Sequence, residues 1–186
     1  MLAVALVAGM MACSNARPRV ELSGLSFEPE PEWVVVPPAS RFRVAQYRLP
    51  WDGAEADLVV FHFGAQGAAK VEDNIARWRS QVRRARKKLD PAKAEVVHEE
   101  YGGIVVDWID LEGTYVAETF PGSGKHHSDP GFRVLAAVVQ TPGGPYYVKM
   151  VGPESVVDRW SGSFANLLAS FQAAPLLSAD PGLSHP

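Results

Sequence analysis

The alternation of apolar and polar residues predicts a chain built mainly from β-strands. Residues 41–49 alternate between apolar and basic side chains, which is typical of a strand with one exposed face. Residues 58–63 are apolar at almost every position, as expected for a strand inside a sheet. Further strands are expected at 33–36, 95–101, 104–115, 132–140 and 146–151. Because Gly102 and Gly103 separate two of these runs, we expect hairpin connections and an antiparallel sheet.

Two segments have the period of an amphipathic helix instead. The first is 70–89, with Glu72 and Asp73 in its first turn and basic residues at its end, the charge order that a helix dipole favours. Its apolar stripe consists of Val71, Ile75, Trp78, Val82, Ala85 and Leu89. The second helix begins at Pro153, since proline is favoured at a first helical position. Its apolar side consists of Val156, Val157, Trp160, Phe164, Leu167, Leu168 and Phe171.

The order of these elements predicts the fold class. Strands precede the first helix, several antiparallel strands follow it, and the second helix comes last. Because amphipathic helices need a sheet face to cover, we expect an α+β domain, an antiparallel β-sheet covered by two helices in an α/β/α-type sandwich. The 186 residues suit a single domain, which we place at 27–172. Residues 173–186 hold three prolines and little periodicity, which favours a flexible tail.

Several aromatic residues accompany this order of elements. Phe27 and Trp33 lie at the entrance of the domain, and a strand–glycine–helix step follows. The aromatic strand 145–150 runs into Gly152-Pro153-Glu154 and then Trp160. Together these features resemble the PsbP/Mog1-like superfamily. The resemblance implies an α+β sandwich that acts as a binding or assembly module, and it implies neither a reaction nor catalytic residues.

The N-terminus carries a different signal. Residues 1–12 are apolar or small and uncharged, and Cys13 follows Ala12 directly. The run is too short to cross a bilayer as a helix, which needs ~20 residues, but it has the length of a secretory signal. A small residue before a cysteine, after an apolar stretch, resembles the lipobox of bacterial lipoproteins.

The lipobox resemblance implies a cellular location and a lipid anchor. Residues 1–12 would be a signal peptide, Cys13 would carry the lipid, and residues 13–26 would form a tether. The implied location is the bacterial cell envelope, at the outer membrane or the periplasmic face, with the membrane as a partner. Two features depart from the family, since no basic residue precedes the run and Met10 stands where leucine is usual. The alternatives are plain secretion and an apolar strand or helix of the fold, with Cys13 buried.

The amino-acid composition argues against several classes of protein. Hydrophobic residues make up 47% and charged residues 21%, which is typical of a globular domain and not of a disordered chain. The single cysteine excludes a disulfide framework within the chain. The net charge of -3 and the absence of a recognised reading motif argue against nucleic acid as a partner.

Positive charge is concentrated in the predicted helix 70–89. This segment holds eight basic and two acidic residues, a net charge of +6, so the rest of a chain with net charge -3 carries -9. Such a face could dock on anionic lipid head groups or on an acidic protein or polymer. The alternative is a solvated helix face that pairs with acidic strands. The candidate partner-binding residues are Arg77, Arg83, Arg84, Arg86, Lys87 and Lys88, together with Trp51, which we expect to be exposed in a loop.

Residues 119–131 form a loop rich in glycine and histidine. His126, His127 and Asp129 have the chemistry of ligands for a divalent metal. Adjacent histidines rarely point at one ion, however, and no HExxH spacing is present. We therefore expect no cofactor and a solvent-exposed loop, with a metal site at these three residues as the alternative.

The sequence thus predicts a lipid-anchored envelope protein that acts as a non-catalytic binding or assembly module, without identifying its ligand. The alternative is a small metal-dependent or hydrolytic enzyme that uses the loop 119–131. No reactive constellation in the sequence supports an enzyme, so the prediction leans against catalysis.

Overall fold

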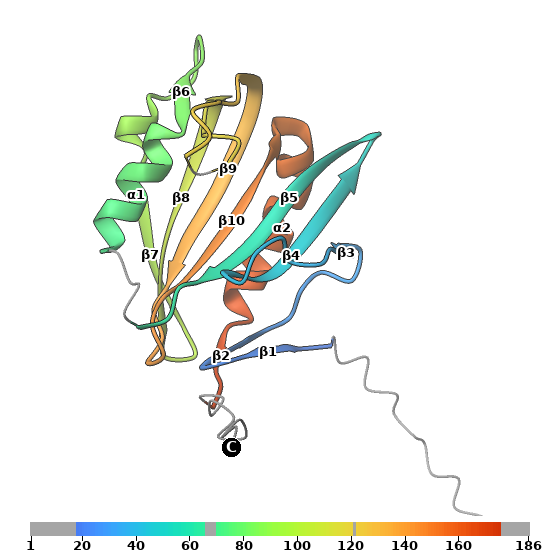
Figure 1. Ribbon diagram of the computed structural model, residues 1–186, viewed down its shortest axis with the longest axis vertical. Coiled ribbons are helices and arrows are strands. Elements are labelled where there is room, and N and C mark those ends of the chain that lie inside the picture. Colours follow the sequence, from blue (N-terminus) through green and yellow to red (C-terminus); the bar gives the residue numbers. More distant parts are fainter. Residues whose placement is uncertain (1–17, 66–69, 121, 176–186) are drawn as a thin grey trace, which may run out of the picture.

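The computed structural model describes residues 18–65, 70–120 and 122–175 (Figure 1). The predicted signal peptide 1–12, Cys13 and residues 176–186 of the predicted tail lie outside this part. The described chain has an α+β fold, with mostly antiparallel sheets and two α-helices, which confirms the predicted class at this level. The helices are α1 (Val71–Ser80), α2 (Glu154–Ala169) and the short 3-10 helix η2 (Pro91–Lys93). The strands are β1 (Val20–Leu22), β2 (Leu25–Phe27), β3 (Val34–Val35), β4 (Arg43–Trp51), β5 (Ala54–His62), β6 (Val82–Arg84), β7 (Val96–Tyr101), β8 (Ile104–Tyr115), β9 (Asp129–Val139), β10 (Tyr146–Pro153) and β11 (Gln172–Ala173).

The main sheet has the strand order β3-β4-β5-β10-β9-β8-β6, and β7 pairs with β8 beside β6. All neighbouring strands in it are antiparallel, as the glycine-containing hairpins predict. β8 has the predicted bounds, and it follows β7 through a turn at Gly102 and Gly103. Both glycines have positive φ, 55° and 81°, a conformation that other residues adopt at a cost.

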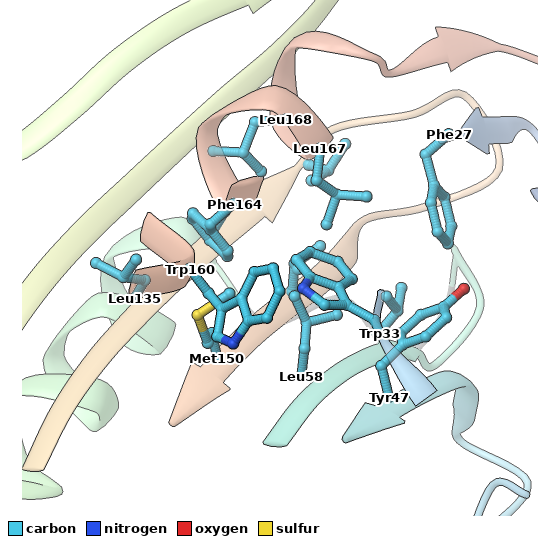
Figure 2. Close-up of a cluster of buried hydrophobic side chains, with 14 of the residues drawn as sticks. Phe27, Trp33, Tyr47, Leu58, Leu135, Met150, Trp160, Phe164, Leu167 and Leu168 are labelled. Carbon is cyan, nitrogen blue, oxygen red and sulfur yellow. The ribbon is translucent and has the colours of Figure 1, made fainter. Parts of the chain in front are cut away.

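Helix α2 packs on one face of this sheet. Leu135, Ala137 and Val139 of β9 project toward it, because alternate residues of a strand point to the same face. Figure 2 shows Trp160 and Phe164 of α2 over the strands, with Trp33 beside them. The Trp33 ring centre lies 6.4 Å from that of Trp160 and 5.8 Å from that of Tyr47. The seven apolar residues predicted for this helix side are all buried.

Helix α1 packs on the other face. The intervening β9 residues Val134, Ala136 and Val138 join Ile75 and Trp78 of α1 in a second buried cluster. The central strands are therefore covered on both sides, which explains their nearly continuous apolar sequences. No helix of the described residues is long and apolar enough to span a bilayer.

The predicted helix 70–89 is wrong in its second half, because α1 stops well short of residue 89. Val82 instead begins β6, where it lies opposite Tyr115 of β8. A longer helix would place like charges such as Arg83 and Lys87 one turn apart, which destabilises helices. The edge of β8 offers the same backbone groups hydrogen-bonding partners without that repulsion. Non-local pairing therefore overrides the helical stripe.

The predicted tether 13–26 is wrong over its last residues. β1 and β2 form a hairpin that belongs to a second sheet, in the order β1-β2-β11. Leu25 and Phe27 are fully buried in the core under α2. Arg19 donates to the carbonyl oxygen of Ser170 at 2.7 Å and ties the start of the described chain to the end of α2. Strands of three residues are too short to show a period, so this hairpin could not be predicted from the sequence.

The predicted tail 173–186 also begins too early. Ala173 of β11 pairs with Leu25, and the Gly24 amide donates to the Pro175 carbonyl oxygen at 3.1 Å. The N-terminal hairpin and the last described strand consequently lie side by side at one end of the molecule, the lower end in Figure 1.

Candidate functional site

Most of the candidate basic residues gather on β6 and the turn after it. We name four exposed side chains there the basic tip: Arg83, Arg84, Arg86 and Lys87. Within the described part of the chain, none of the four forms an ion pair with a carboxylate. In Figure 1, β6 and its turn lie at the end of the molecule opposite β1 and β2. Arg77 lies apart from them on α1 and donates to Asn74 Oδ1 at 2.9 Å.

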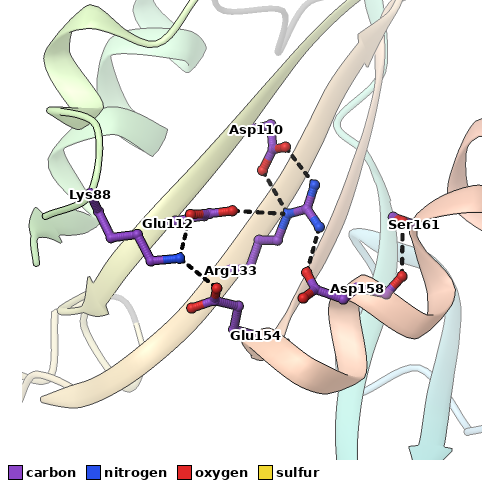
Figure 3. Close-up of polar contacts among 7 residues, drawn as sticks. All are labelled: Lys88, Asp110, Glu112, Arg133, Glu154, Asp158 and Ser161. Carbon is purple, nitrogen blue, oxygen red and sulfur yellow. Dashed lines mark hydrogen bonds and ion pairs between the residues drawn. The ribbon is translucent and has the colours of Figure 1, made fainter.

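Lys88 follows the basic tip, but its amine pairs with two carboxylates of the same chain (Figure 3). Its Nζ lies 2.8 Å from Glu112 of β8 and 2.5 Å from Glu154 of α2. The hydrogen bonds that Lys88 donates to these two carboxylates raise its pKa above the usual range. Lys88 thus connects the turn to β8 and α2, and its charge is compensated locally.

Arg133 of β9 holds a neighbouring set of carboxylates, also shown in Figure 3. Its Nε and Nη2 donate to the two oxygens of Asp110 at 2.9 and 2.6 Å, and its Nη1 donates to Asp158 of α2 at 2.6 Å. The bond to Asp110 is the main reason why the pKa of Arg133 lies above its usual range. The planar guanidinium makes a two-point contact with Asp110 and keeps a further donor for Asp158. They join β8, β9 and α2.

Trp51 is exposed, as predicted, with 44% of its surface accessible. It ends β4, next to the turn Asp52-Gly53, and the guanidinium carbon of Arg159 lies 5.0 Å from its ring centre. β4 and β6 belong to opposite margins of the main sheet. The structure therefore does not bring Trp51 together with the basic tip.

The loop 119–131 is shorter than predicted, because β9 begins at Asp129. His127 Nδ1 lies 2.9 Å from Asp129 Oδ2, whereas His126 Nδ1 lies 3.0 Å from the carbonyl oxygen of Val116. The two imidazoles thus have different partners. In residues 18–65, 70–120 and 122–175, no three His, Cys, Asp or Glu side chains are placed to hold a metal ion.

A cluster of titratable groups that the sequence did not reveal lies between α1 and the sheet. Lys149 of β10 donates to Gln81 Oε1 at 2.6 Å and to the Tyr115 hydroxyl at 2.9 Å. Burial, with a smaller effect of the Arg77 charge, lowers the pKa of Lys149 to about 7. Burial and then the nearby carboxylate of Asp129 raise the pKa of Tyr115 to about 12.

This cluster contains a group suited to acid–base chemistry. An amine with a pKa near 7 is partly neutral at neutral pH and can accept a proton. His127, in the loop 119–131, lies next to this cluster, since its ring centre lies 5.2 Å from that of Tyr115. The only sequence signal is one lysine in the otherwise apolar run 146–151. Its burial depends on contacts with Gln81, 68 residues away.

The described chain is an α+β fold in which two helices pack against mostly antiparallel sheets, with buried aromatic residues between them. The chain is similar to the solution structure of cyanobacterial PsbP (CyanoP) from Synechocystis sp. PCC 6803, with 14% sequence identity and a TM-score of 0.51. The match covers 90% of this chain and 99% of that one. At this identity the likeness concerns the fold, and it confirms the PsbP part of the resemblance found in the sequence.

A second solved structure, from Bacteroides thetaiotaomicron, matches with 8% identity and a TM-score of 0.44, over 81% of this chain and 45% of that one. No protein-family model matches the sequence, and no curated protein is significantly similar to it.

Proposed function

We propose that the protein is a non-catalytic binding or assembly module, held at the bacterial cell envelope by a lipid on Cys13. Its domain is a PsbP-like α/β/α-type sandwich, with one helix against each face of the main sheet. The observation that carries the binding role is the basic tip, where four exposed cations lack a carboxylate partner among the described residues. The lipobox-like sequence before Cys13 supports the anchor.

The charge distribution supports an acidic partner. The segment 70–89 carries +6, while the remainder of the chain carries -9. A charged patch of this kind raises the rate of encounter with surfaces of opposite sign. Because the four side chains are exposed, each contact with a partner contributes only ~0.2–1 kcal/mol, and binding weakens as salt increases.

The anchor is tested by metabolic labelling with a fatty acid in a bacterial host. We expect the native chain to take up the label and to sediment with membranes, and the Cys13→Ala variant to lose both properties. The Ser14→Ala variant serves as the control, because it alters the neighbouring residue and leaves the sulfur in place. Equal labelling of the Cys13→Ala variant would refute the anchor.

The partner is tested by co-purification from envelope fractions with charge-reversed variants. Reversal of Arg83 and Lys87 to glutamate should remove the partner, since it lowers the net charge of the basic tip from +4 to zero. The matched control reverses Arg41 and Lys125, two exposed cations elsewhere on the molecule. Retention of the same partner by the first variant would count against the proposed surface.

A second candidate function is hydrolysis at the cluster of Lys149, Tyr115 and His127. The observation that favours it is the lowered pKa of Lys149 at the base of the loop 119–131. In this case Lys149 is the general base, so hydrolysis of a simple ester such as p-nitrophenyl acetate should rise through pH 7. The Lys149→Met variant should lose this rise and the Lys125→Met variant should keep it. An identical pH profile in the native chain and both variants would exclude Lys149 as the general base of a hydrolase.

A further inference from the structure

A groove lies directly beside the basic tip, between the end of α1 and the segment 82–92. It has a volume of about 390 Å³ and is open to solvent. Apolar and basic side chains make up most of its lining. They are Ala76, Arg79, Val82, Arg84, Pro91 and Ala92.

The two arginines of the groove have unused hydrogen-bonding capacity. Arg79 donates through Nη2 to the Ala94 carbonyl oxygen at 2.6 Å, but its Nε is buried without a partner in the described residues. Buried donors of this kind are rare, because an unmade hydrogen bond costs ~1–3 kcal/mol. Arg84 is exposed, and its Nε donates to the Lys88 carbonyl oxygen at 3.2 Å.

The acidic residue of the groove forms no ion pair with either arginine, so the lining holds two positive charges against one negative charge. Asp90 lies in the lining, but one of its carboxylate oxygens accepts from the Ala92 amide at 3.1 Å. No carboxylate of the described residues forms an ion pair with Arg79 or Arg84. The groove is thus complementary to a carboxylate that comes from outside the molecule.

The position of the groove favours a partner away from the anchoring membrane. α1 ends and β6 begins at the upper end of the molecule in Figure 1, while β1 lies at the lower end. The chain between Cys13 and Val20 can span at most ~25 Å, whereas β8 alone, with 12 residues, is ~40 Å long. A lipid on Cys13 therefore holds the lower end at the bilayer and leaves the upper end free to project from it.

We infer that this groove binds an acidic peptide segment of a protein partner, with a glutamate or aspartate carboxylate between Arg79 and Arg84 and a neighbouring apolar side chain on the exposed Ala76 and Ala92. Guanidinium groups pair with carboxylates through two parallel hydrogen bonds, and the apolar lining suits a peptide side chain. A lipid head group or a phosphate polymer has no group that would use this lining. The inference rests on the proposed function, since it names the partner of the same basic surface.

Fluorescence anisotropy with a labelled decapeptide of alternating glutamate and alanine tests this inference. The full chain is used with Cys13→Ser, so that no lipid interferes, and a glutamine–alanine decapeptide is the uncharged probe. We expect the acidic peptide alone to bind, and Arg84→Gln to weaken it about three- to fivefold, because an exposed ion pair contributes up to ~1 kcal/mol. Arg48→Gln, at another exposed arginine, should change binding less than about twofold.

Three results would overturn the inference. The first is equal weakening by Arg48→Gln, which would indicate general charge attraction. The second is that phosphatidylglycerol vesicles or polyphosphate bind more tightly than the peptide, and that Arg84→Gln abolishes this tighter binding. The third is a chain with Arg83→Gln and Lys87→Gln that loses as much affinity as Arg84→Gln, which overturns the groove while the proposed basic surface stands. A Cys13 without lipid, in contrast, refutes the proposed anchor and leaves the peptide result unchanged.

Discussion

Lys149 shows how one buried side chain links stability to pH. Its amine is held by a glutamine and a tyrosine, both uncharged, and no carboxylate among the described residues forms an ion pair with it. Folding therefore removes the ammonium group from water without supplying a counter-charge, which costs free energy. The hydroxyl of Tyr115 and the amide of Gln81 offset only part of that cost, and the pKa of Lys149 falls to about 7 as a result.

The free energy of unfolding should consequently rise between pH 7 and pH 9. In this range the unfolded chain keeps a proton on Lys149 that the folded chain has released, since the pKa falls from 10.5 to about 7 on folding. In the Lys149→Met variant the rise should be smaller by about 1–2 kcal/mol. Urea unfolding at the two pH values measures this, with Lys125→Met as the control for an exposed lysine. Parallel pH profiles for the native chain and Lys149→Met would show that the amine is not buried.

At the scale of elements, the contact between β6 and β8 sets the position of the basic tip. Gly113 of β8 lies opposite Arg84, and a Cβ atom at Gly113 would lie 2.4 Å from the Arg83 carbonyl oxygen and 2.9 Å from Val82 Cγ1. These distances are too short for any side chain, so β6 can approach β8 only because this residue is glycine.

The Gly113→Ala variant should be destabilised by about 1–3 kcal/mol, since β6 must move away from β8. Hydrogen exchange should increase at Val82 and Arg84, and urea unfolding should give the loss of stability. Gly162→Ala is a control of opposite sign. A Cβ at Gly162, on the exposed side of α2, meets nothing within 4 Å, and alanine is the better helix former by ~1 kcal/mol. A stability of Gly113→Ala equal to that of the native chain would contradict the close approach.

Arg133 joins three elements, and its removal should be costly. Arg133→Met leaves Asp110 and Asp158 without their guanidinium, so we expect a loss of about 1–3 kcal/mol in urea unfolding. Arg48→Met is the comparison, because Arg48 and Glu55 form an exposed pair that contributes below ~1 kcal/mol. Equal losses in the two variants would mean that the network of Arg133 does not cross-link the fold.

The elements also show what local sequence can predict. Strands such as 104–115 and helix α2 follow from their own periods, because each buries one regular set of positions. α1 could not be bounded in this way, since its C-terminal limit depends on an edge of β8 some 30 residues further along. The same holds for the groove and for Lys149, whose surroundings come from segments distant in sequence. By contrast, the exposed basic tip was predictable, because charge density needs no knowledge of pairing.

At the scale of the whole molecule, the short sheet β1-β2-β11 closes the core under α2. Phe27 and Phe171 meet edge to face with ring centres 6.1 Å apart, and the Tyr146 hydroxyl donates to the Ser23 carbonyl oxygen at 2.6 Å. The N-terminal hairpin is thus part of the domain and not part of a linker.

A chain that begins at Phe27, the boundary expected from sequence, should be less stable than one that begins at Pro18. It lacks the buried Leu25 and the contacts of Arg19 with the end of α2, so we expect a loss of about 3 kcal/mol or more. Thermal or urea unfolding of the two chains gives the difference. Equal stability of the two chains would show that residues 18–26 do not stabilise the domain and act only as a tether.

The pairing of the last described strand with the N-terminal hairpin has a practical consequence for labelling. A fluorescent protein fused directly after Pro175 departs from the pole of the domain that holds β1 and β2, since the Pro175 carbonyl oxygen accepts a hydrogen bond from the Gly24 amide. β6 and its turn lie at the opposite end of the molecule, so such a reporter leaves Arg84 unobstructed.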